Sequence, residues 1–304
     1  MNPVQYQFCR LIEPHIPCLR RLQPIPTWTT GYRSSPQTPL CQVRAKQWLA
    51  NRKLFVRRLY KNVKVLIRPG EEISECVYVE GYYEPNQMYF LDHQLKPGAV
   101  FIDAGANDGL YTLFAAHKVG PQGLVISIEP STREYEHLCK NIRLNDFKNI
   151  RTLRAAVSNV SGFAELKVAE SSKSGHNTLS QSFYYKDTTL EAVEKINTTT
   201  IDEVTEADSI SRVDILKLDI EGWELSALEG ATRTLVKFRP LLMIEIICEN
   251  GSAFGSNSGK IWEFLTNYGY QMKTYSSVNG LPVEATEHPG PGYTDFIAVP
   301  KKSV

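Results

Sequence analysis

From residue 99 onward the chain alternates short apolar runs with segments of helical spacing, and this alternation limits the possible folds more than any other feature. The apolar runs cover residues 99–103, 124–128, 150–157, 213–218 and 241–247, and late strands are expected at 270–275 and 296–299. Helical spacing covers residues 110–119, 134–144, 225–238 and 261–268. Continuous apolar strands that alternate with helices are typical of a parallel sheet covered on both faces. The pattern therefore predicts an α/β domain.

The N-terminal part of the chain, through position 62, differs from the rest in charge and proline content. Through position 61 there are eleven Lys and Arg side chains against one acid, Glu13, and seven of the 17 prolines lie between Pro3 and Pro39. Because proline removes backbone donors and disfavours helix in the preceding residue, we predict an irregular segment. One helix is expected over residues 45–60, with Trp48, Phe55 and Leu59 on its apolar stripe. The predicted domains are a basic N-terminal extension, residues 1–62, and a folded domain, residues 63–304.

The expected helix has a basic edge, for which two interpretations stay open. The edge consists of Lys46, Lys53, Arg57 and Lys61. A helix packed on the folded domain with a solvated basic face is one interpretation. Contact of residues 1–62 with an anionic membrane surface or a phosphate-bearing substrate is the other.

The expected location is the cytoplasm, with peripheral membrane contact as an alternative. The chain has no apolar stretch of about 18 residues, and its start lacks the layout of a signal peptide. The six cysteines are scattered without a C-x-x-C pair, so no metal site is predicted from them. Two short strands, 63–67 and 75–79, are expected around the turn at Pro69 and Gly70.

Three of the predicted strands end in an acid: Asp103, Glu129 and Asp219. Ligands of open α/β sheets bind beyond the carboxyl ends of the strands, so these carboxylates mark the expected site. The first acid opens the sequence D-A-G-A-N-D-G at 103–109, whose small residues allow close backbone approach. It is not G-x-G-x-x-G, because Asn107 and Leu110 interrupt that spacing. A phosphate-free nucleoside is therefore favoured over a dinucleotide.

Glu129 follows the second predicted strand, one helix and one strand beyond Gly109. An acid at this place accepts hydrogen bonds from ribose hydroxyls. Asp103 suits a cationic ligand, because a carboxylate-rich pocket attracts positive charge. A nucleoside with a free ribose, a positive charge and no phosphate describes S-adenosylmethionine, which is the predicted cofactor.

Four stretches together resemble the FkbM-type family of S-adenosylmethionine-dependent methyltransferases. They are F-I-D-A-G-A-N-D-G at 101–109, I-E-P at 128–130, L-K-L-D-I-E-G-W-E at 216–224 and M-I-E-I at 243–246. G-Y-Y-E-P at 81–85 and T-T-I-D at 199–202 are similar to family segments that precede two of its strands. The similarity covers about residues 63–299, and the chain ahead of Lys61 has no counterpart in the family core.

The resemblance implies a class I methyltransferase (Rossmann-like) fold: a seven-stranded, mostly parallel sheet with one antiparallel strand near its end. It implies roles in cofactor binding for nine residues. Around the methionine end it implies Asp103, Gly105, Asn107 and Gly109, at the ribose Glu129, near the adenine Ala156 and Ser158, as a closing residue Glu84, and as a further cofactor contact Asp219. Many relatives in this fold class have an Asp near the adenine, where this chain has Ala156 and Ser158, so we expect a backbone contact there instead.

The resemblance also implies methyl transfer to a hydroxyl of a sugar, a glycan or a small natural product. A neutral hydroxyl needs a base as the new bond forms. Asp219 and Glu221, in the sequence D-I-E-G, are candidates, and alternation would place both on one side of an extended chain. His176 is a third candidate, although a solvated loop histidine explains it as well. Glu245 lies in an apolar strand, which indicates a site-facing or structural acid.

Three other functions are alternatives to methyl transfer to a hydroxyl. The basic extension raises a nucleic-acid methyltransferase, but the fourth strand lacks the Asn/Asp-Pro-Pro-aromatic turn that suits an exocyclic amine, so a nucleic-acid partner is disfavoured. A nicotinamide oxidoreductase is disfavoured by the missing G-x-G-x-x-G. A binding protein that kept the fold without catalysis stays open. Neither the identity of the acceptor nor the oligomeric state follows from the sequence.

Overall fold

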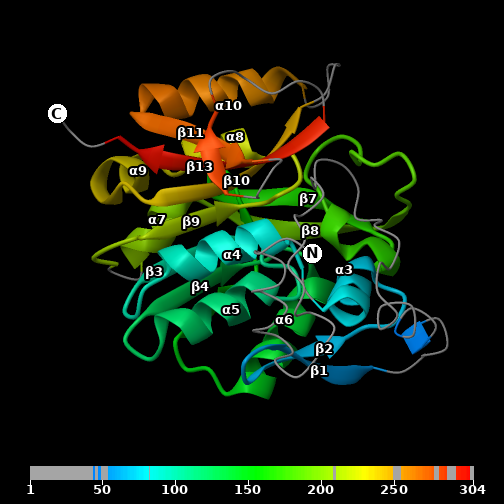
Figure 1. Ribbon diagram of the computed structural model, residues 1–304. Helices are drawn as coiled ribbons and strands as arrows, with labels where there is room; N and C mark the ends of the chain where they lie inside the picture. The colour runs from blue at the N-terminus through cyan, green and yellow to red at the C-terminus, as the bar shows by residue number, and fades with distance from the viewer. Residues whose placement is uncertain are drawn as a thin grey trace.

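The computed structural model describes residues 44, 47–48, 54–81, 83–207, 210–248, 255–276, 281–285 and 292–301. Its main sheet contains β3 (Val100–Ala104), β4 (Leu124–Ile128), β5 (Ile150–Leu153), β9 (Ile215–Leu218), β10 (Leu241–Cys248), β11 (Tyr270–Tyr275), β12 (Pro282–Glu284) and β13 (Gly292–Pro300). The strand order is β12-β11-β13-β10-β9-β3-β4-β5 (Figure 1). Strands β10, β9, β3, β4 and β5 are parallel, and β13 is antiparallel to β10.

This sheet confirms the predicted α/β class and the mostly parallel arrangement with an antiparallel strand near the end. All seven strands implied by the resemblance are present. The eighth, β12, is a three-residue edge strand that pairs antiparallel with β11.

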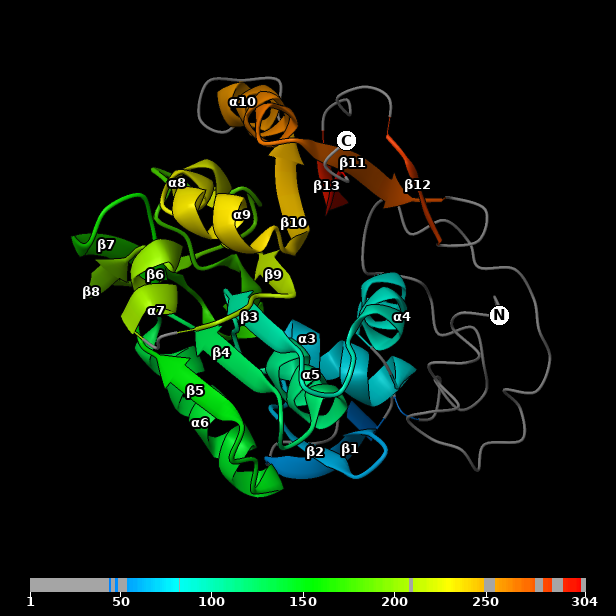
Figure 2. The same cartoon turned by 90° about the vertical axis from the view of Figure 1, so that its left-hand side faces the viewer.

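Helices cover both faces of the sheet (Figure 2). One face is covered by α4 (Pro85–Gln94), α5 (Leu110–Val119) and α6 (Thr132–Asn145), and the other by α7 (Ile201–Ala207), α8 (Glu224–Glu229), α9 (Thr232–Phe238) and α10 (Gly255–Asn267). Side chains of one strand alternate between the two faces. Thus Phe101 joins the buried cluster under α5, whereas its neighbour Ile102 joins the cluster under α8 and α9. This double coverage explains why the strands are continuously apolar.

The predicted helix over residues 45–60 is wrong in its second half. Residues Phe55–Tyr60 form β1, which pairs antiparallel with β2 (Val63–Ile67). Lys61 adopts a positive φ of 44° at the turn between the two strands. The buried positions of Trp48 and Leu59 were anticipated, but Leu59 reaches the core from a hairpin. Helical spacing misled because Phe55 and Leu59, four positions apart, fit a period of 3.6 and a period of 2 equally well.

The strand predicted over residues 75–79 is also wrong. This segment forms α3 (Glu72–Glu75) and then a π-helix, η2 (Cys76–Glu80). The Glu71 side chain starts the helix, because it accepts the backbone N–H groups of Ile73 at 3.0 Å and Ser74 at 2.7 Å. The sequence carried a signal for this helix, because the acid Glu71 stands directly before its first residue, Glu72.

Two further predicted elements are divided in the structure. The strand expected over 150–157 splits into β5 and β6 (Ala156–Val157), and β6 belongs to a small sheet of order β6-β8-β7 with β7 (Gly162–Ala169) and β8 (Leu190–Thr199). The helix expected over 225–238 is interrupted at Gly230. A Cβ at Gly230 would lie 2.1 Å from the Ser158 carbonyl oxygen, so close packing against the β6 region fixes this break.

The basic extension lies largely outside the described residues. The Pro-rich segment through residue 43, and most of residues 45–53, are among the undescribed positions. The β1–β2 hairpin joins residues on both sides of position 62, where the sequence analysis divides the chain, and the division stays a prediction. Among the helices of the described part, none combines the length and apolar character needed to cross a bilayer.

Candidate functional site

A cavity of about 1240 Å³ lies beyond the carboxyl ends of β3, β4 and β9. Its far wall comes from α3, η2, the 3-10 helix η3 (Ser171–His176) and residues 184–187. Ten carboxylate side chains line it: Glu71, Glu72, Glu75, Glu84, Asp108, Glu129, Asp187, Asp219, Glu221 and Glu245. The basic side chains in the wall are Lys173, Lys186 and Lys217. The cavity is therefore rich in acids, as the sequence predicts for a cationic ligand.

The loop after β3 approaches the sheet so closely that it requires glycine. Gly105 has a φ of 80°, and a Cβ there would lie 1.8 Å from the Asp219 carbonyl oxygen. The N–H groups of Gly105 and Ala106 both donate to the Ile128 carbonyl, at 3.0 and 3.1 Å. The loop is thus held against β9 on one side and β4 on the other. Gly109, with a φ of 87°, instead makes room for Leu138 of α6.

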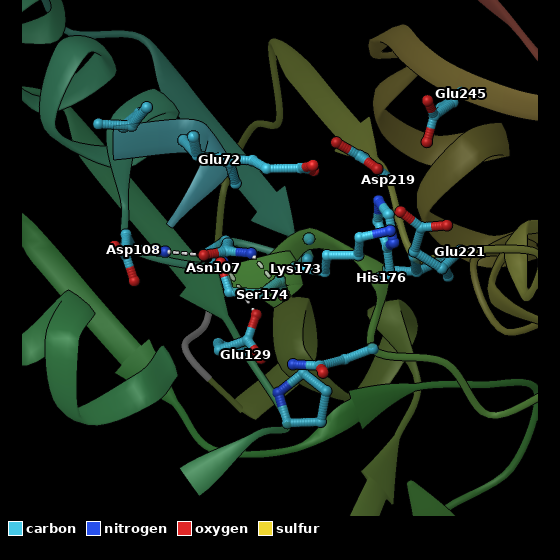
Figure 3. A pocket seen from close by; sticks show the side chains of 18 of the residues that line it. Glu72, Asn107, Asp108, Glu129, Lys173, Ser174, His176, Asp219, Glu221 and Glu245 are labelled. Carbon is cyan, nitrogen blue, oxygen red and sulfur yellow. Dashed lines mark hydrogen bonds between the residues drawn. The ribbon is translucent and has the colours of Figure 1, made fainter. Parts of the chain in front are cut away.

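Glu129 connects this loop to the end of β4. Its Oε2 accepts the Asn107 backbone N–H at 2.8 Å, and Figure 3 labels both residues. Its Oε1 accepts the Ser131 N–H at 2.9 Å. The side chain lies on the cavity wall, although the residue is only 4% exposed. Burial raises the pKa of Glu129 to about 8, and the nearby Glu134 adds to the rise. Each carboxylate oxygen retains acceptor capacity for a ligand hydroxyl.

A buried polar group of side chains lies where β9 passes between β3 and β10. The Lys217 ammonium donates to Asp219 Oδ2 at 2.7 Å and lies 4.5 Å from the centre of the Tyr111 ring. Burial alone would raise the pKa of Asp219, but Lys217 and a hydrogen bond with Glu245 together hold it below the usual value. Asp103 pairs in register with Lys217, and its Oδ2 accepts the Thr112 hydroxyl at 2.6 Å. Burial raises the pKa of Asp103.

Asp219, Glu221 and Glu245 form a cluster of acids in the wall. One oxygen from each lies within 4.8 Å of the others, a spacing that could hold a metal ion. However, the Lys217 ammonium already supplies a positive charge to Asp219. Burial, together with the charge of Asp219, raises the pKa values of Glu221 and Glu245 well above their usual range. One lysine therefore offsets part of the negative charge of this cluster, and the surroundings favour the protonated forms of its two glutamates.

Glu221 lies past the end of β9, in the left-handed region with a φ of 53°. The strand has already turned there, so simple alternation does not govern its direction. It lines the cavity together with Asp219, and Figure 3 draws both on the same side as His176.

His176 closes the cavity at the end of η3. Its Nδ1 lies 2.7 Å from the Thr188 hydroxyl, and its ring stacks on Tyr185 with 4.2 Å between centroids. Burial, with a smaller contribution from Lys173, lowers the pKa of His176 to about 4. The imidazole is therefore neutral near pH 7.

The remaining predicted cofactor residues divide between the wall and positions behind it. Glu84, at the start of α4 with a φ of 42°, lines the cavity and accepts the Tyr111 hydroxyl. Ala156 also lines it, whereas Ser158 lies behind the wall and accepts the indole N–H of Trp223 at 3.2 Å. Asp103 and Gly109, like Ser158, are not lining residues. These three support the site through other groups.

The sequence alone did not identify four residues that line the cavity or contact its wall: Arg68, Tyr111, Ser174 and Lys217. Lys217 lies inside the quoted stretch L-K-L-D, so a lysine in an apolar strand was an available signal. Arg68 and Ser174 carried no such signal, because they belong to segments that only the folded chain brings to the loop after β3.

Comparison with known proteins places these features in a family. The profile described as the methyltransferase FkbM domain matches residues 103–272. The methyltransferase sdnD of Sordaria araneosa is 27% identical over 170 residues, which are 46% of this chain and 65% of that protein. The chain thus spans just under two thirds of this curated relative.

Two solved structures are among the matches to this chain. A methyltransferase FkbM from Methylobacillus flagellatus KT is 20% identical, with 66% of this chain and 44% of that chain covered and a TM-score of 0.41. Fibrillarin from Aeropyrum pernix, solved with natively bound S-adenosyl-L-methionine, is 13% identical, with 68% of each chain covered and a TM-score of 0.39.

Proposed function

The chain belongs to the FkbM methyltransferase family, and we propose that it transfers a methyl group from S-adenosylmethionine to a hydroxyl oxygen. The observation that carries the proposal is Glu129, a cavity-lining acid at the end of β4 that is joined to the glycine-containing loop after β3. This pairing of a strand-end acid with a close backbone turn suits the ribose of a nucleoside, and the missing G-x-G-x-x-G spacing disfavours a dinucleotide.

The wall residues fit this cofactor. Glu129 would accept the ribose hydroxyls, and Ala156 would lie beside the adenine. Glu84, Asn107 and Asp219 would surround the charged methionine end, where carboxylates favour the ammonium and sulfonium groups. When bound, the cofactor supplies a methyl group that its sulfonium already activates.

The acceptor would occupy the rest of the cavity. The wall formed by α3, η2 and η3 offers both carboxylates and aromatic side chains, including Glu72, Tyr83 and Tyr185. Hydroxyl groups of a sugar or a small natural product could hydrogen-bond the former, and their apolar faces could pack on the latter. The chain's part would be to align this hydroxyl and to exclude water.

Glu221 is the proposed base that receives the hydroxyl proton. Asp219 is already paired with Lys217 at 2.7 Å, and His176, with a pKa of about 4, would be a weak base. A carboxylate whose pKa is raised holds a proton more strongly near neutral pH. Burial and the neighbouring charge of Asp219 both raise the pKa of Glu221. Ionised Glu221 would therefore be a stronger base than Asp219 or His176.

Titration calorimetry with S-adenosylhomocysteine and with NADH tests the cofactor. We expect binding of the first and none of the second, and the opposite result would overturn the proposal. Mass spectrometry of candidate sugars, natural products and RNA, incubated with the protein and unlabelled S-adenosylmethionine, tests the reaction. A gain of about 14 daltons on a hydroxyl compound supports it. A gain of mass on RNA would favour a nucleic-acid methyltransferase. Binding of the cofactor without transfer to any acceptor would favour a binding protein without catalytic activity.

A further inference from the structure

Arg68 lies at the end of β2, outside the stretch that matches the family profile, yet it reaches the loop after β3. Its Nε and Nη2 donate to the two carboxylate oxygens of Asp108, at 2.9 and 2.8 Å. Arg68 is 7% exposed and Asp108 is 3% exposed, so the pair is shielded from water. A planar guanidinium with two parallel bonds fixes the orientation of its partner as well as its charge.

Asp108 belongs to the part of the loop that presents Asn107. The Asp108 backbone N–H donates to Asn107 Oδ1 at 2.7 Å, and the Asn107 N–H donates to Glu129. A second connection runs through Asn141 of α6, whose side chain accepts the Leu66 N–H at 2.8 Å and donates to the Asp108 carbonyl at 2.7 Å. Strand β2 thus holds both the side chain and the backbone of Asp108.

The same guanidinium also reaches the opposite wall of the cavity. Arg68 Nη2 donates to the Ser174 hydroxyl at 3.1 Å, and that hydroxyl donates to Glu71 at 2.8 Å. The Ser174 carbonyl accepts the Asn107 side-chain N–H at 3.0 Å (Figure 3). The loop that would bind the cofactor and the segment that would face the acceptor are therefore attached to one buried side chain.

The surroundings of Arg68 are strongly acidic. Three buried carboxylates surround Arg68: Asp108, Glu71 and Glu134, the last at 3.6 Å from Nη1. A buried carboxylate without a partner is costly, so the loop geometry depends on this cation.

We propose that Arg68 is a positioning residue for cofactor binding, which acts through Asp108 to hold Asn107 against Glu129. The inference rests on the proposed function. It assigns part of the cofactor site to the β1–β2 hairpin, ahead of the family-matched region.

The test measures the affinity of the full chain for S-adenosylhomocysteine by calorimetry, well below the unfolding temperature. Arg68→Lys keeps the charge but loses the second parallel bond, and we expect affinity to fall about tenfold. Arg133→Lys is the matched control, because Arg133 also pairs with Glu134, at 2.7 Å, but its hydrogen bonds within the described residues go to Glu134, Glu191 and the Ala169 carbonyl and not to the loop after β3. Its affinity should stay within about twofold of the wild-type value.

A double mutant separates positioning from general support. In an Asp108→Asn background, Arg68→Lys should cause little further loss of affinity, because the two residues act together. Additive losses, or an Arg68→Lys protein that binds as tightly as wild type, would overturn the inference. If Arg68→Lys does not fold, Asp108→Asn alone should show the same tenfold loss, and its absence counts against the inference. Wild-type protein that fails to bind S-adenosylhomocysteine would instead refute the proposed function.

Discussion

Glu129 accepts the backbone N–H of Asn107 at 2.8 Å, so the acid after β4 is joined directly to the loop after β3. The two strands are neighbours in the sheet, and their carboxyl ends meet at the same edge. The contact joins two features that the sequence marks separately, and both residues line the same wall of the cavity. Its consequences for ligand binding are testable.

At about pH 8.5, where Glu129 with its pKa of about 8 is mostly ionised, replacing it by Gln should weaken the binding of S-adenosylhomocysteine by about 10- to 100-fold. The variant loses a charged acceptor, and hydrogen bonds to charged groups contribute about 1.5–3 kcal/mol. Calorimetry measures the dissociation constant, and circular dichroism checks that the fold is retained. Unchanged affinity in a folded variant would remove Glu129 from the ribose site.

Affinity for 5′-methylthioadenosine should rise with pH between about 6.5 and 9. The pKa of Glu129 is raised to about 8, and the ionised form accepts ribose hydroxyls better. This ligand avoids the titration of an amino acid moiety. The rise should disappear in Glu129→Gln, whereas a rise that persists would point to Glu134 or Asp108, the neighbouring carboxylates.

The same shift has an opposite effect on stability. The pKa of Glu129 in the folded protein lies above the usual 4.5. The contribution of its protonated form to the free energy of unfolding is therefore fully present below about pH 4.5 and is lost as the pH rises through about 8. Ligand binding and folding thus favour different protonation states of one side chain.

Gly105→Ala should destabilise the fold far more than Gly98→Ala. The two glycines have φ values of 80° and 82°, so both variants carry similar backbone strain of about 1–2 kcal/mol. Only at Gly105 would the Cβ meet a backbone atom, the Asp219 oxygen at 1.8 Å, whereas nothing lies within 4 Å at Gly98. The overlap should add about 1–3 kcal/mol or more in urea unfolding. Equal losses would show that the loop after β3 can move away from β9.

The sequence was sufficient for features set by local pattern. The apolar runs predicted β3 and β4 because burial on both faces leaves no polar alternation to obscure them. The glycine at 105 and the acid at 129 marked the site because each satisfies a local requirement of a strand end. The sequence did not reveal that Arg68 meets Asp108, since 40 residues separate them and only tertiary packing brings them together. It also did not separate Asp103, behind the wall, from Asp219, on it.

Lys217→Met should cost about 3–5 kcal/mol in the free energy of unfolding, because it leaves the buried Asp103, and Asp219 beside it, without a nearby cation. Lys118→Met is a matched control. Lys118 pairs with Asp92 at the same 2.7 Å, but the Lys118 side chain is 21% exposed against 7% for Lys217, and we expect a loss of about 0–1 kcal/mol. Adding Asp219→Asn to Lys217→Met should recover part of the stability. If the double variant is no more stable than Lys217→Met, the lysine acts through packing rather than charge.

Glu221→Gln should lower kcat by about 10²- to 10⁴-fold with an acceptor identified by mass spectrometry, because the amide cannot take the hydroxyl proton. The dissociation constant of S-adenosylhomocysteine should change less than about twofold, since the proposed role concerns the acceptor. In the wild type, kcat should rise with pH as Glu221 ionises, since its pKa is raised, and this rise should vanish in the variant. Glu165→Gln, an exposed acid on β7, controls for loss of a carboxylate. Should His176→Asn abolish the pH-dependent rise while Glu221→Gln retains it, the base is His176 and not Glu221.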